Sequence, residues 1–267
     1  MHPVLFQIGN FPVRSYGVLL MIGVAIAAFW AAKRTEKFGL KPEVVWDGLL
    51  WMIIPGILGA RGVYMATHWD EFAGRPDRIF SIQFNGLTSF GGVIFSIIGL
   101  LIYVRIKKIP VWPMLDMIAV PCLVAHAIGR VGCLLNGCCF GYPCTGGVCV
   151  HVEGHTGTFL PAQGLDTLLC LVIAGVLLLI ERKQLKPGVG FMMGVIGYAV
   201  SRFIFEFWRA GPFDPATGTY LPDLLGSTPL TKAQWMSTLL IVLSIVVVIL
   251  RLRASSSDDS SGGPTQA

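Results

Sequence analysis

The chain has 267 residues, of which 54% are hydrophobic and only 13% charged, and its mean hydropathy is +0.70. This composition excludes an ordinary water-soluble domain and is typical of a polytopic membrane protein. The formal net charge is +5. No DNA- or RNA-binding motif accompanies that charge, so we expect no nucleic-acid partner and attribute the basic residues to membrane topology.

Seven apolar segments in chain order predict membrane-spanning helices. They cover residues 16–33, 45–67, 89–105, 113–133, 162–181, 189–208 and 233–250. The first segment lacks the basic start and small-residue cleavage site of a signal peptide, so we expect it to be a retained helix. The sequence therefore predicts an all-α polytopic membrane protein with about seven transmembrane helices around an outward-side polar cavity.

The basic residues also predict the orientation and the domain boundaries. The connections after the first, third, fifth and seventh segments carry twelve Lys and Arg residues, whereas the other side carries six. The positive-inside rule then places the N terminus outside and the C terminus in the cytoplasm. We expect one integral membrane domain over residues 1–253. The Ser-, Asp- and Gly-rich residues 254–267 should form a disordered cytoplasmic tail.

Three arginines, Arg61, Arg130 and Arg202, lie inside or beside apolar segments. A charged side chain at membrane depth is costly, so it normally faces a polar interior and serves a ligand or a partner. The planar guanidinium matches phosphate oxygens, which points to a phospholipid head group. The alternative is that each arginine only pairs with a carboxylate and holds the helices together.

Polar residues recur along the sixth apolar segment. Tyr198, Arg202, Glu206 and Arg209 are spaced four, four and three residues apart, which places them on one face of a helix. Arg202 and Glu206 are therefore expected to pair across one helical turn. This face is suited to line a head-group cavity, and an internal salt bridge is compatible with that role.

Other polar and glycine positions fall on the same side of the predicted bundle. Tyr16 begins the first segment, and Gln163 and Asp166 begin the fifth. The sequences Ser-Phe-Gly-Gly at 89–92 and Gly-Arg-Val-Gly at 129–132 contain glycines that let a backbone approach closely. All of these positions map to the outer half of the bundle, so we expect a polar site there.

Five cysteines crowd into seventeen residues, and they are Cys133, Cys138, Cys139, Cys144 and Cys149. Because this stretch is predicted to face an oxidising exterior, we expect at least one disulfide, with a connectivity that sequence does not fix. A metal site with His126, His151 and His155 is a weaker alternative, since the spacing fits no standard zinc pattern. The adjacent Cys138 and Cys139 also differ from the Cys-x-x-Cys of thiol oxidoreductases, which disfavours a redox role.

The sequence Gly-Arg-Val-Gly-Cys-Leu-Leu-Asn-Gly-Cys-Cys-Phe-Gly at 129–141 resembles the signature of the prolipoprotein diacylglyceryl transferases. That signature reads Gly-Arg-x-Gly-Asn-Phe-x-Asn-Gly-Glu, with a glycine three residues on, and Arg130, Asn136 and Gly141 match it. The resemblance spans about residues 10–250. It also includes Arg14–Gly17, Gly59–Tyr64, Pro161–Gln163, the helix face from Tyr198 to Arg209, and Leu230–Trp235.

The resemblance implies an enzyme that moves a diacylglyceryl group from phosphatidylglycerol to the lipobox cysteine of a prolipoprotein. Its partners would be phosphatidylglycerol, other membrane lipids and the prolipoprotein signal peptide, in a bacterial cytoplasmic (inner) membrane and without a cofactor or metal. Four positions depart from the family pattern. Cys133 replaces asparagine, Cys138 replaces glutamate, Phe90 replaces histidine and Asp166 replaces glutamate. These departures affect the acid–base groups and leave the arginines in place.

The resemblance also implies roles for individual residues. The catalytic set comprises Arg130, Arg202, Tyr16 and Glu206, because cations at the leaving phosphate stabilise the transition state. The substrate-binding set comprises Arg130, Arg61, Asn136, Gly141, Gln163, Asp166, Tyr198 and Arg209. The base that deprotonates the acceptor thiol stays open among Glu206, Tyr16, His126 and the lipid phosphate.

Two other functions fit the same residues. One is a family relative that acts on another acceptor through the same lipid site, or that uses its own cysteines as a relay. The other is a non-enzymatic lipid-binding or redox membrane protein.

Overall fold

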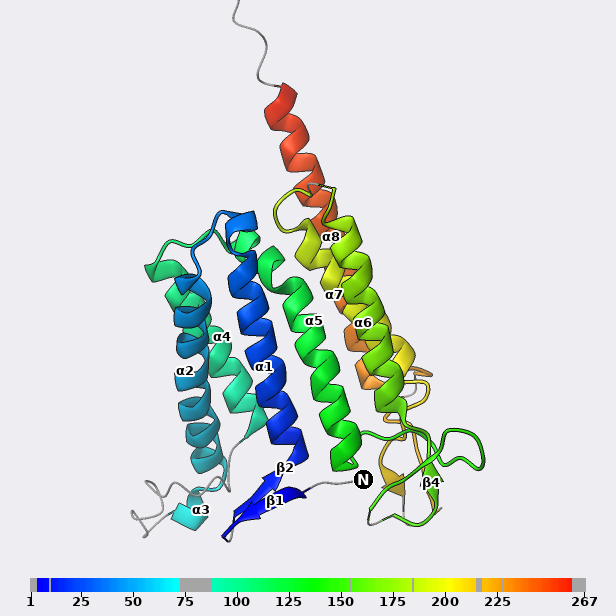
Figure 1. Cartoon of the computed structure of the whole chain (residues 1–267). Coiled ribbons are helices and arrows are strands. Elements are labelled where there is room, and N and C mark those ends of the chain that lie inside the picture. The colour runs from blue at the N-terminus through cyan, green and yellow to red at the C-terminus, as the bar shows by residue number, and fades with distance from the viewer. Residues whose placement is uncertain are drawn as a thin grey trace, which may run out of the picture. The chain divides into compact units, whose positions relative to one another are not determined.

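The computed structural model describes residues 4–9, 11–72, 88–153, 155–183, 185–214, 218–226 and 228–260. They form two compact units. Unit 1 combines residues 1–30 with 115–267, and unit 2 comprises residues 31–114. The elements of each unit are described separately below and are labelled in Figure 1.

Helices form most of both units. Unit 1 contains most of α1 (Ser15–Arg34) and α5 (Val111–Asn136), with α6 (Ala162–Ile180), α7 (Val189–Phe205) and α8 (Lys232–Ser260). Unit 2 contains the short helices η1 (Glu36–Phe38) and α3 (Trp69–Phe72) and the long helices α2 (Glu43–Thr67) and α4 (Ser89–Ile106). Each of the seven predicted apolar segments falls on one of the long helices.

The described helices include five that are long and apolar enough to cross a membrane: α1, α2, α5, α6 and α8 up to Arg253. The apolar part of α4 (Gly91–Ile106) and α7 are shorter. Large apolar side chains are exposed along these helices, for example Met21 at 70% and Leu58 at 67%. Such surfaces suit hydrocarbon, in which helices satisfy their own backbone groups. The predicted all-α polytopic membrane protein is therefore confirmed.

The end of α8 differs from the predicted domain boundary. The helix continues to Ser260, past the boundary expected at residue 253. The remainder of the predicted tail, residues 261–267, lies outside the described residues.

In the described residues of unit 1, three two-stranded antiparallel hairpins occur that were not predicted. β1 (Val4–Ile8) pairs with β2 (Phe11–Arg14), β3 (Val150–His151) with β4 (Thr158–Phe159), and β5 (Phe213–Asp214) with β6 (Thr219–Tyr220). Their registers place Val4 opposite Arg14, Val150 opposite Phe159 and Phe213 opposite Tyr220. The last two hairpins have only two residues in each strand, too few to give an alternating sequence pattern.

In unit 2, α2 and α4 pack with their backbones in close approach. A Cβ atom added at Gly91 would lie 2.5 Å from the carbonyl oxygen of Gly59, so a larger residue does not fit there. Between the same two helices, Ser96 Oγ of α4 donates a hydrogen bond to the Met52 carbonyl oxygen of α2 over 2.9 Å. The prediction that the glycines at 91–92 permit a close backbone contact is confirmed at Gly91.

The core of unit 1 lies between α5, α6 and α7, which run side by side in Figure 1. Val120 and Leu123 of α5 are buried against Ala174 and Leu177 of α6, and Tyr198 of α7 packs on this cluster. α7 also packs against α6 and α8. This three-helix core fixes the ends of the helices, where the polar residues gather.

Asp116 joins α5 to the start of α7. Its buried carboxylate accepts hydrogen bonds from the Gly188 backbone N–H over 2.5 Å and from the Phe191 N–H over 2.7 Å. The first N–H groups of a helix have no intrahelical acceptor, and the helix dipole favours an anion there. Asp116 therefore caps a helix that begins more than seventy residues later in the chain.

Replacing Asp116 with alanine is expected to lower the free energy of unfolding by about 3 kcal/mol, because two buried N–H groups lose a charged acceptor. Thermal unfolding of the detergent-solubilised protein measures this loss. The control is Asp223→Ala, which removes an exposed ion pair with Lys232 of 2.9 Å. That change should cost less than about 1 kcal/mol. Equal destabilisation by the two variants would contradict the capping role.

Candidate functional site

The predicted polar residues of unit 1 converge at one end of its helices. Arg130 lies in the last turns of α5, Asp166 in the first turns of α6, and Arg202 in the last turn of α7. Tyr16 lies in the first turn of α1. Because α6 runs back along α5 and α7 returns, these turns meet at the end of the unit that the charge count assigns to the exterior.

Asp166 is the centre of this cluster, and only 1% of its side chain is exposed. Its Oδ2 atom lies 2.5 Å from Arg130 Nε and 3.5 Å from His126 Nε2. Its Oδ1 atom accepts a hydrogen bond from Ser201 Oγ over 2.8 Å. The carboxylate thus joins α5, α6 and α7, and a buried charge needs such partners.

The second arginine, Arg202, packs on the same aromatic ring as Arg130. The guanidinium carbons of Arg130 and Arg202 lie 4.8 Å and 5.1 Å from the centre of the Phe205 ring. Arg202 Nη2 lies 3.0 Å from Glu206 Oε2, which confirms the predicted pair one turn apart. Arg209 Nη1 approaches Glu206 Oε1 to 3.6 Å. Two guanidinium groups therefore share one ring, as cation–π contacts permit.

Both arginines pair with carboxylates, so the purely structural alternative weighed from the sequence agrees with part of the geometry. However, one guanidinium donor of this pair of arginines is not used by a carboxylate. Arg202 Nη1 is buried and has no hydrogen-bond partner among the described residues. Gln163 Oε1 is likewise buried without a partner in that part of the chain. Buried polar atoms are nearly always hydrogen-bonded, so these two indicate a ligand that would complete the site.

The loop after α5 is held against the site by Gln163 and Gly141. Gln163 Nε2 donates a hydrogen bond to the Cys138 carbonyl oxygen over 2.5 Å, and the Gly141 N–H donates to the Leu160 carbonyl oxygen over 2.8 Å. A Cβ atom at position 141 would lie 2.5 Å from the Trp208 carbonyl oxygen. The motif glycine is therefore required by backbone packing, which explains its place in the signature without a direct substrate contact.

The other residues predicted to bind substrate or act in catalysis lie on several different helices. Asn136 is the last residue of α5 and is half-buried. Tyr16 lies against Gly132, where an added Cβ atom would be 3.4 Å from the Tyr16 Cα. The Tyr198 ring packs edge-on to His126 with centroids 5.1 Å apart. Arg61 belongs to α2 of unit 2, where its guanidinium lies 5.4 Å from the Phe72 ring centre.

The cysteine cluster divides into two groups. Cys144 and Cys149 form a disulfide, which confirms the prediction of at least one cross-link among the five clustered cysteines. Cys133, Cys138 and Cys139 are free. Cys139 has a backbone φ of 62°, an uncommon value for a residue other than glycine. A hydrogen bond from the Cys133 thiol, assisted by the charges of Arg130 and Arg209, lowers the pKa of Cys139 to about 5.

Cys139 is therefore expected to react with iodoacetamide at about pH 6 roughly tenfold faster than an ordinary thiol, since its larger thiolate fraction outweighs the weaker nucleophilicity of a low-pKa thiolate. Its reactivity should rise through a pH of about 5 as the thiol loses its proton. Cys133→Ala removes the hydrogen bond and should move this rise to higher pH. Mass spectrometry of the Cys139 peptide measures it, and a wild-type midpoint near that of a free cysteine would contradict the prediction.

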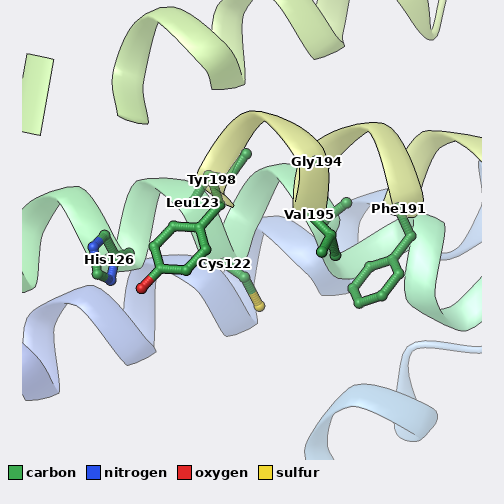
Figure 2. A pocket seen from close by; sticks show the side chains of 8 residues that line it. Cys122, Leu123, His126, Phe191, Gly194, Val195 and Tyr198 are labelled. Carbon is green, nitrogen blue, oxygen red and sulfur yellow. The ribbon is translucent and has the colours of Figure 1, made fainter. Parts of the chain in front are cut away.

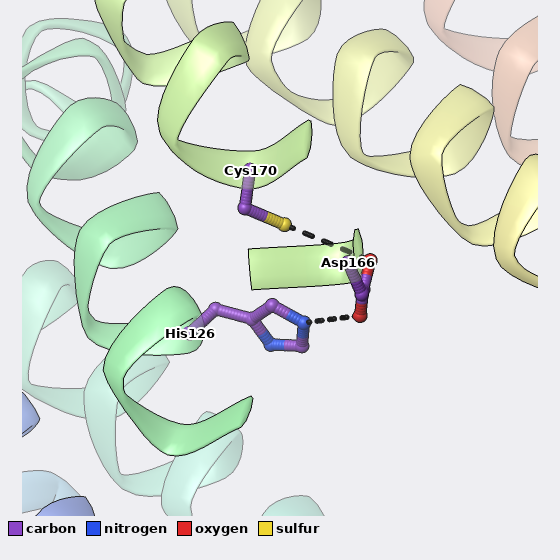
Figure 3. Close-up of side chains that lie close together, drawn as sticks. All are labelled: His126, Asp166 and Cys170. Carbon is purple, nitrogen blue, oxygen red and sulfur yellow. Dashed lines mark hydrogen bonds and ion pairs between the residues drawn. The ribbon is translucent and has the colours of Figure 1, made fainter. Parts of the chain in front are cut away.

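One cluster of donor atoms has the composition of a metal site. The side-chain donors of His126, Asp166 and Cys170 all lie within 4.8 Å of one another (Figure 3). However, Arg130 Nε lies 2.5 Å from Asp166 Oδ2 and 3.3 Å from His126 Nε2. The guanidinium already supplies the positive charge at these donors, so we interpret the cluster as the binding site of Arg130.

Several site contacts were missed in the sequence. The sequence patterns did not single out Ser201, Cys170 or Phe205, although Ser201 binds Asp166 and Phe205 packs on both arginines. Helical spacing was the available signal, because Cys170 follows Asp166 by four residues and Arg130 follows His126 by four. The side chain of Phe90, the position of the family histidine, lies outside the described part of the structure.

The fold and the site together define a polytopic membrane protein with a buried, arginine-rich site at one end of a helical unit, suited to an anionic lipid head group. The family model described as prolipoprotein diacylglyceryl transferase matches residues 3–250. The chain belongs to this family.

Individual relatives match this chain over most of their length. The phosphatidylglycerol–prolipoprotein diacylglyceryl transferase of Shouchella clausii is 30% identical over 252 residues, which cover 90% of this chain and 86% of the relative. The protein of the same name from Listeria monocytogenes is 31% identical over 256 residues, 91% of this chain and 87% of the relative. That of Dehalococcoides mccartyi is 31% identical over 231 residues, 84% and 88% of the two chains.

Proposed function

We propose that this protein transfers a diacylglyceryl group from phosphatidylglycerol to the lipobox cysteine thiol of prolipoproteins. The names of its relatives support this assignment. The observation that carries it in the structure is the buried, unpartnered Nη1 donor of Arg202, beside the guanidinium of Arg130. We place the protein in the bacterial cytoplasmic membrane, with the N terminus outside and the C terminus in the cytoplasm.

The phosphate of phosphatidylglycerol is the group that the arginines recognise. A phosphate oxygen accepts well from a guanidinium fork, and Arg202 has a donor available for it within the described site. Arg130 and Arg202 on the Phe205 ring supply two positive charges at this end of unit 1. Asp166 and Glu206 hold the two guanidinium groups in place.

The transfer is a displacement at the glyceryl carbon that carries the phosphate ester. The acceptor cysteine thiolate forms a new carbon–sulfur bond there, the carbon–oxygen bond to phosphate breaks, and glycerol phosphate leaves. Negative charge grows on the leaving oxygen. Cations fixed at the phosphate therefore stabilise the transition state more than the bound lipid, which is the condition for acceleration.

His126 is our choice of base for the acceptor thiol, given that Phe90 stands at the position of the family histidine. Its Nε2 atom lies 3.5 Å from the buried Asp166 Oδ2. Arg130 Nε also lies 3.3 Å from this Nε2 atom and donates to it when the proton is on Nδ1. The active tautomer instead carries its proton on Nε2, directed to the Asp166 carboxylate, which leaves the Nδ1 lone pair to accept the thiol proton. The Tyr198 ring packs against the imidazole and fixes its plane. A carboxylate that orients a histidine is a recurrent arrangement for activating nucleophiles.

His126→Ala is expected to lower kcat by a factor of about 10² or more, the usual contribution of a general base. Added imidazole should restore part of the rate, because it replaces the missing group. The matched control is His155→Ala, since His155 lies in the outer loop, 3.0 Å from the Tyr220 hydroxyl. The His155→Ala variant should keep the wild-type kcat, and added imidazole should not change it. An imidazole-insensitive His126→Ala variant with nearly full activity would assign the base elsewhere.

The other predicted residues complete the proposal. Glu206 positions Arg202 and Arg209, and Gln163 and Gly141 position the loop that borders the site. Within unit 1, we assign substrate contacts to Tyr16, Asn136, Tyr198 and Arg209.

Complementation tests the whole function. The full chain is expressed in a bacterial strain whose own diacylglyceryl transferase is repressed, and conversion of prolipoproteins to their lipidated form is followed. We expect the wild-type chain to restore the conversion and Arg202→Lys to fail. Membrane-inserted wild-type protein that does not restore it would contradict the function and favour a relative with another acceptor.

A further inference from the structure

An apolar groove runs between α5 and α7, beneath the arginine site. It encloses about 230 Å³ and is lined by Ala119, Cys122, Leu123, His126, Phe191, Gly194, Val195 and Tyr198. Figure 2 shows His126 and Tyr198 together at one end and Phe191 toward the other. Apart from these two polar residues, the lining offers no strong hydrogen-bonding side chain, so the groove favours an apolar occupant over water.

Polar contacts at both ends of the groove define its length. At the inner end, Asp116 ties α5 to the start of α7 through Gly188 and Phe191. At the outer end, Asp166 links Arg130 of α5 to Ser201 of α7. The lining residues between these contacts run from 119 to 126 and from 191 to 198, seven residue steps on each helix, or about 10 Å at 1.5 Å per residue.

The groove is continuous with the arginine site. His126 lines it and lies 3.3 Å from Arg130 Nε, and Tyr198 lines it and packs on His126. We infer that this groove binds one acyl chain of the anionic phospholipid whose phosphate contacts Arg130 and Arg202. The inference rests on the proposed function for the identity of the head group and adds the position of the lipid tail.

The size of the groove decides between an acyl chain and an apolar peptide helix. One turn of an α-helix with its side chains, about 5.4 Å long and 10 Å wide, occupies roughly 400 Å³. The groove, at about 230 Å³, is too small for that turn but accommodates a single unbranched chain. Cys122 is exposed in the groove, so its lining is accessible to a lipid.

Photo-crosslinking of the full chain in detergent micelles tests this site directly. The probe is a trace of phosphatidylglycerol with a diazirine in one acyl chain, and the adducts are mapped by mass spectrometry. We expect adducts on the groove segments 119–126 and 191–198. Bulk lipid should also label the exposed outer face of α6 at Leu168, Leu171 and Val172.

Competition by unlabelled lipids distinguishes adducts in the groove from adducts formed by bulk lipid. A tenfold excess of unlabelled phosphatidylglycerol should lower all adducts by roughly tenfold by mass action. The same excess of phosphatidylcholine with identical chains should lower only the α6 adducts, because it lacks the head group for the arginine site. Groove adducts that fall equally with both lipids would overturn the inference. Selective groove labelling in a protein without transfer activity would instead contradict the proposed reaction. The inference that the groove binds an acyl chain would then still stand.

Filling the groove provides a second measurement. Val195→Trp and, as a less disruptive variant, Cys122→Phe should remove the groove adducts. They should also raise KM for long-chain phosphatidylglycerol by roughly tenfold, because about two methylene groups of the chain would no longer be buried. KM for a short-chain lipid should change little. Val172→Trp, on the exposed face of α6, is the matched control and should change neither. Unchanged chain-length dependence in both folded groove variants would overturn the inference.

Discussion

Replacing Arg130 or Arg202 with lysine is expected to lower diacylglyceryl transfer by about a hundredfold or more and to leave the fold intact. Lysine keeps the charge, so it still pairs with Asp166 or Glu206, but it loses the planar fork that donates two hydrogen bonds at once. At Arg202 the lost donor includes the buried, unpartnered Nη1 atom. Losing one charge-assisted contact to the transition state costs about 3 kcal/mol.

The transfer rate of each variant in phosphatidylglycerol vesicles measures this effect, and thermal unfolding checks that the variants fold. Arg105→Lys is the matched control, because Arg105 is exposed near the end of α4. It should keep the wild-type rate. Nearly full activity in both site variants would show that the two arginines are structural. Each would then only pair with its carboxylate and hold the helices together.

Replacing Asp166 with asparagine is expected to lower the free energy of unfolding by roughly 3–5 kcal/mol, because Arg130 would remain as a buried and unpaired charge. Asp166 is 1% exposed and contacts Arg130, His126 and Ser201. The variant should also lose transfer activity, since both the phosphate-binding arginine and the proposed base depend on this carboxylate.

A double-mutant cycle separates the two effects of Asp166. Arg130→Gln combined with Asp166→Asn removes both charges, so it should recover part of the stability lost in Asp166→Asn alone. Transfer should stay absent, because the phosphate has lost its arginine. Chemical unfolding and the vesicle assay supply the two readouts. A double variant with the summed destabilisation of its single changes would show that the pair is not coupled.

The helices and their polar faces were accessible from sequence because they depend on local patterns. Apolar runs alone located all the long helices, and the four-residue spacing of Arg202 and Glu206 predicted their contact. The five clustered cysteines predicted a disulfide, but not that Cys144 would pair with Cys149, because connectivity depends on loop geometry.

The contacts between helices were not predictable in the same way. Arg130 and Asp166 are far apart in sequence, as are Asp116 and Gly188, and only the packing of α5, α6 and α7 brings them together. The unpartnered Arg202 donor and the groove beside Tyr198 are likewise properties of packed side chains. The resemblance named the residues of the site, whereas the structure shows which carboxylate holds which arginine.

The most direct test of the account uses the purified full chain in phosphatidylglycerol vesicles with a synthetic lipobox peptide. We predict that the cysteine of the peptide gains the mass of one diacylglyceryl group and that one glycerol phosphate is released for each modified peptide. Vesicles of phosphatidylcholine alone should give neither product. A peptide that stays unmodified in vesicles in which the Listeria monocytogenes relative modifies it would contradict the proposed transfer reaction.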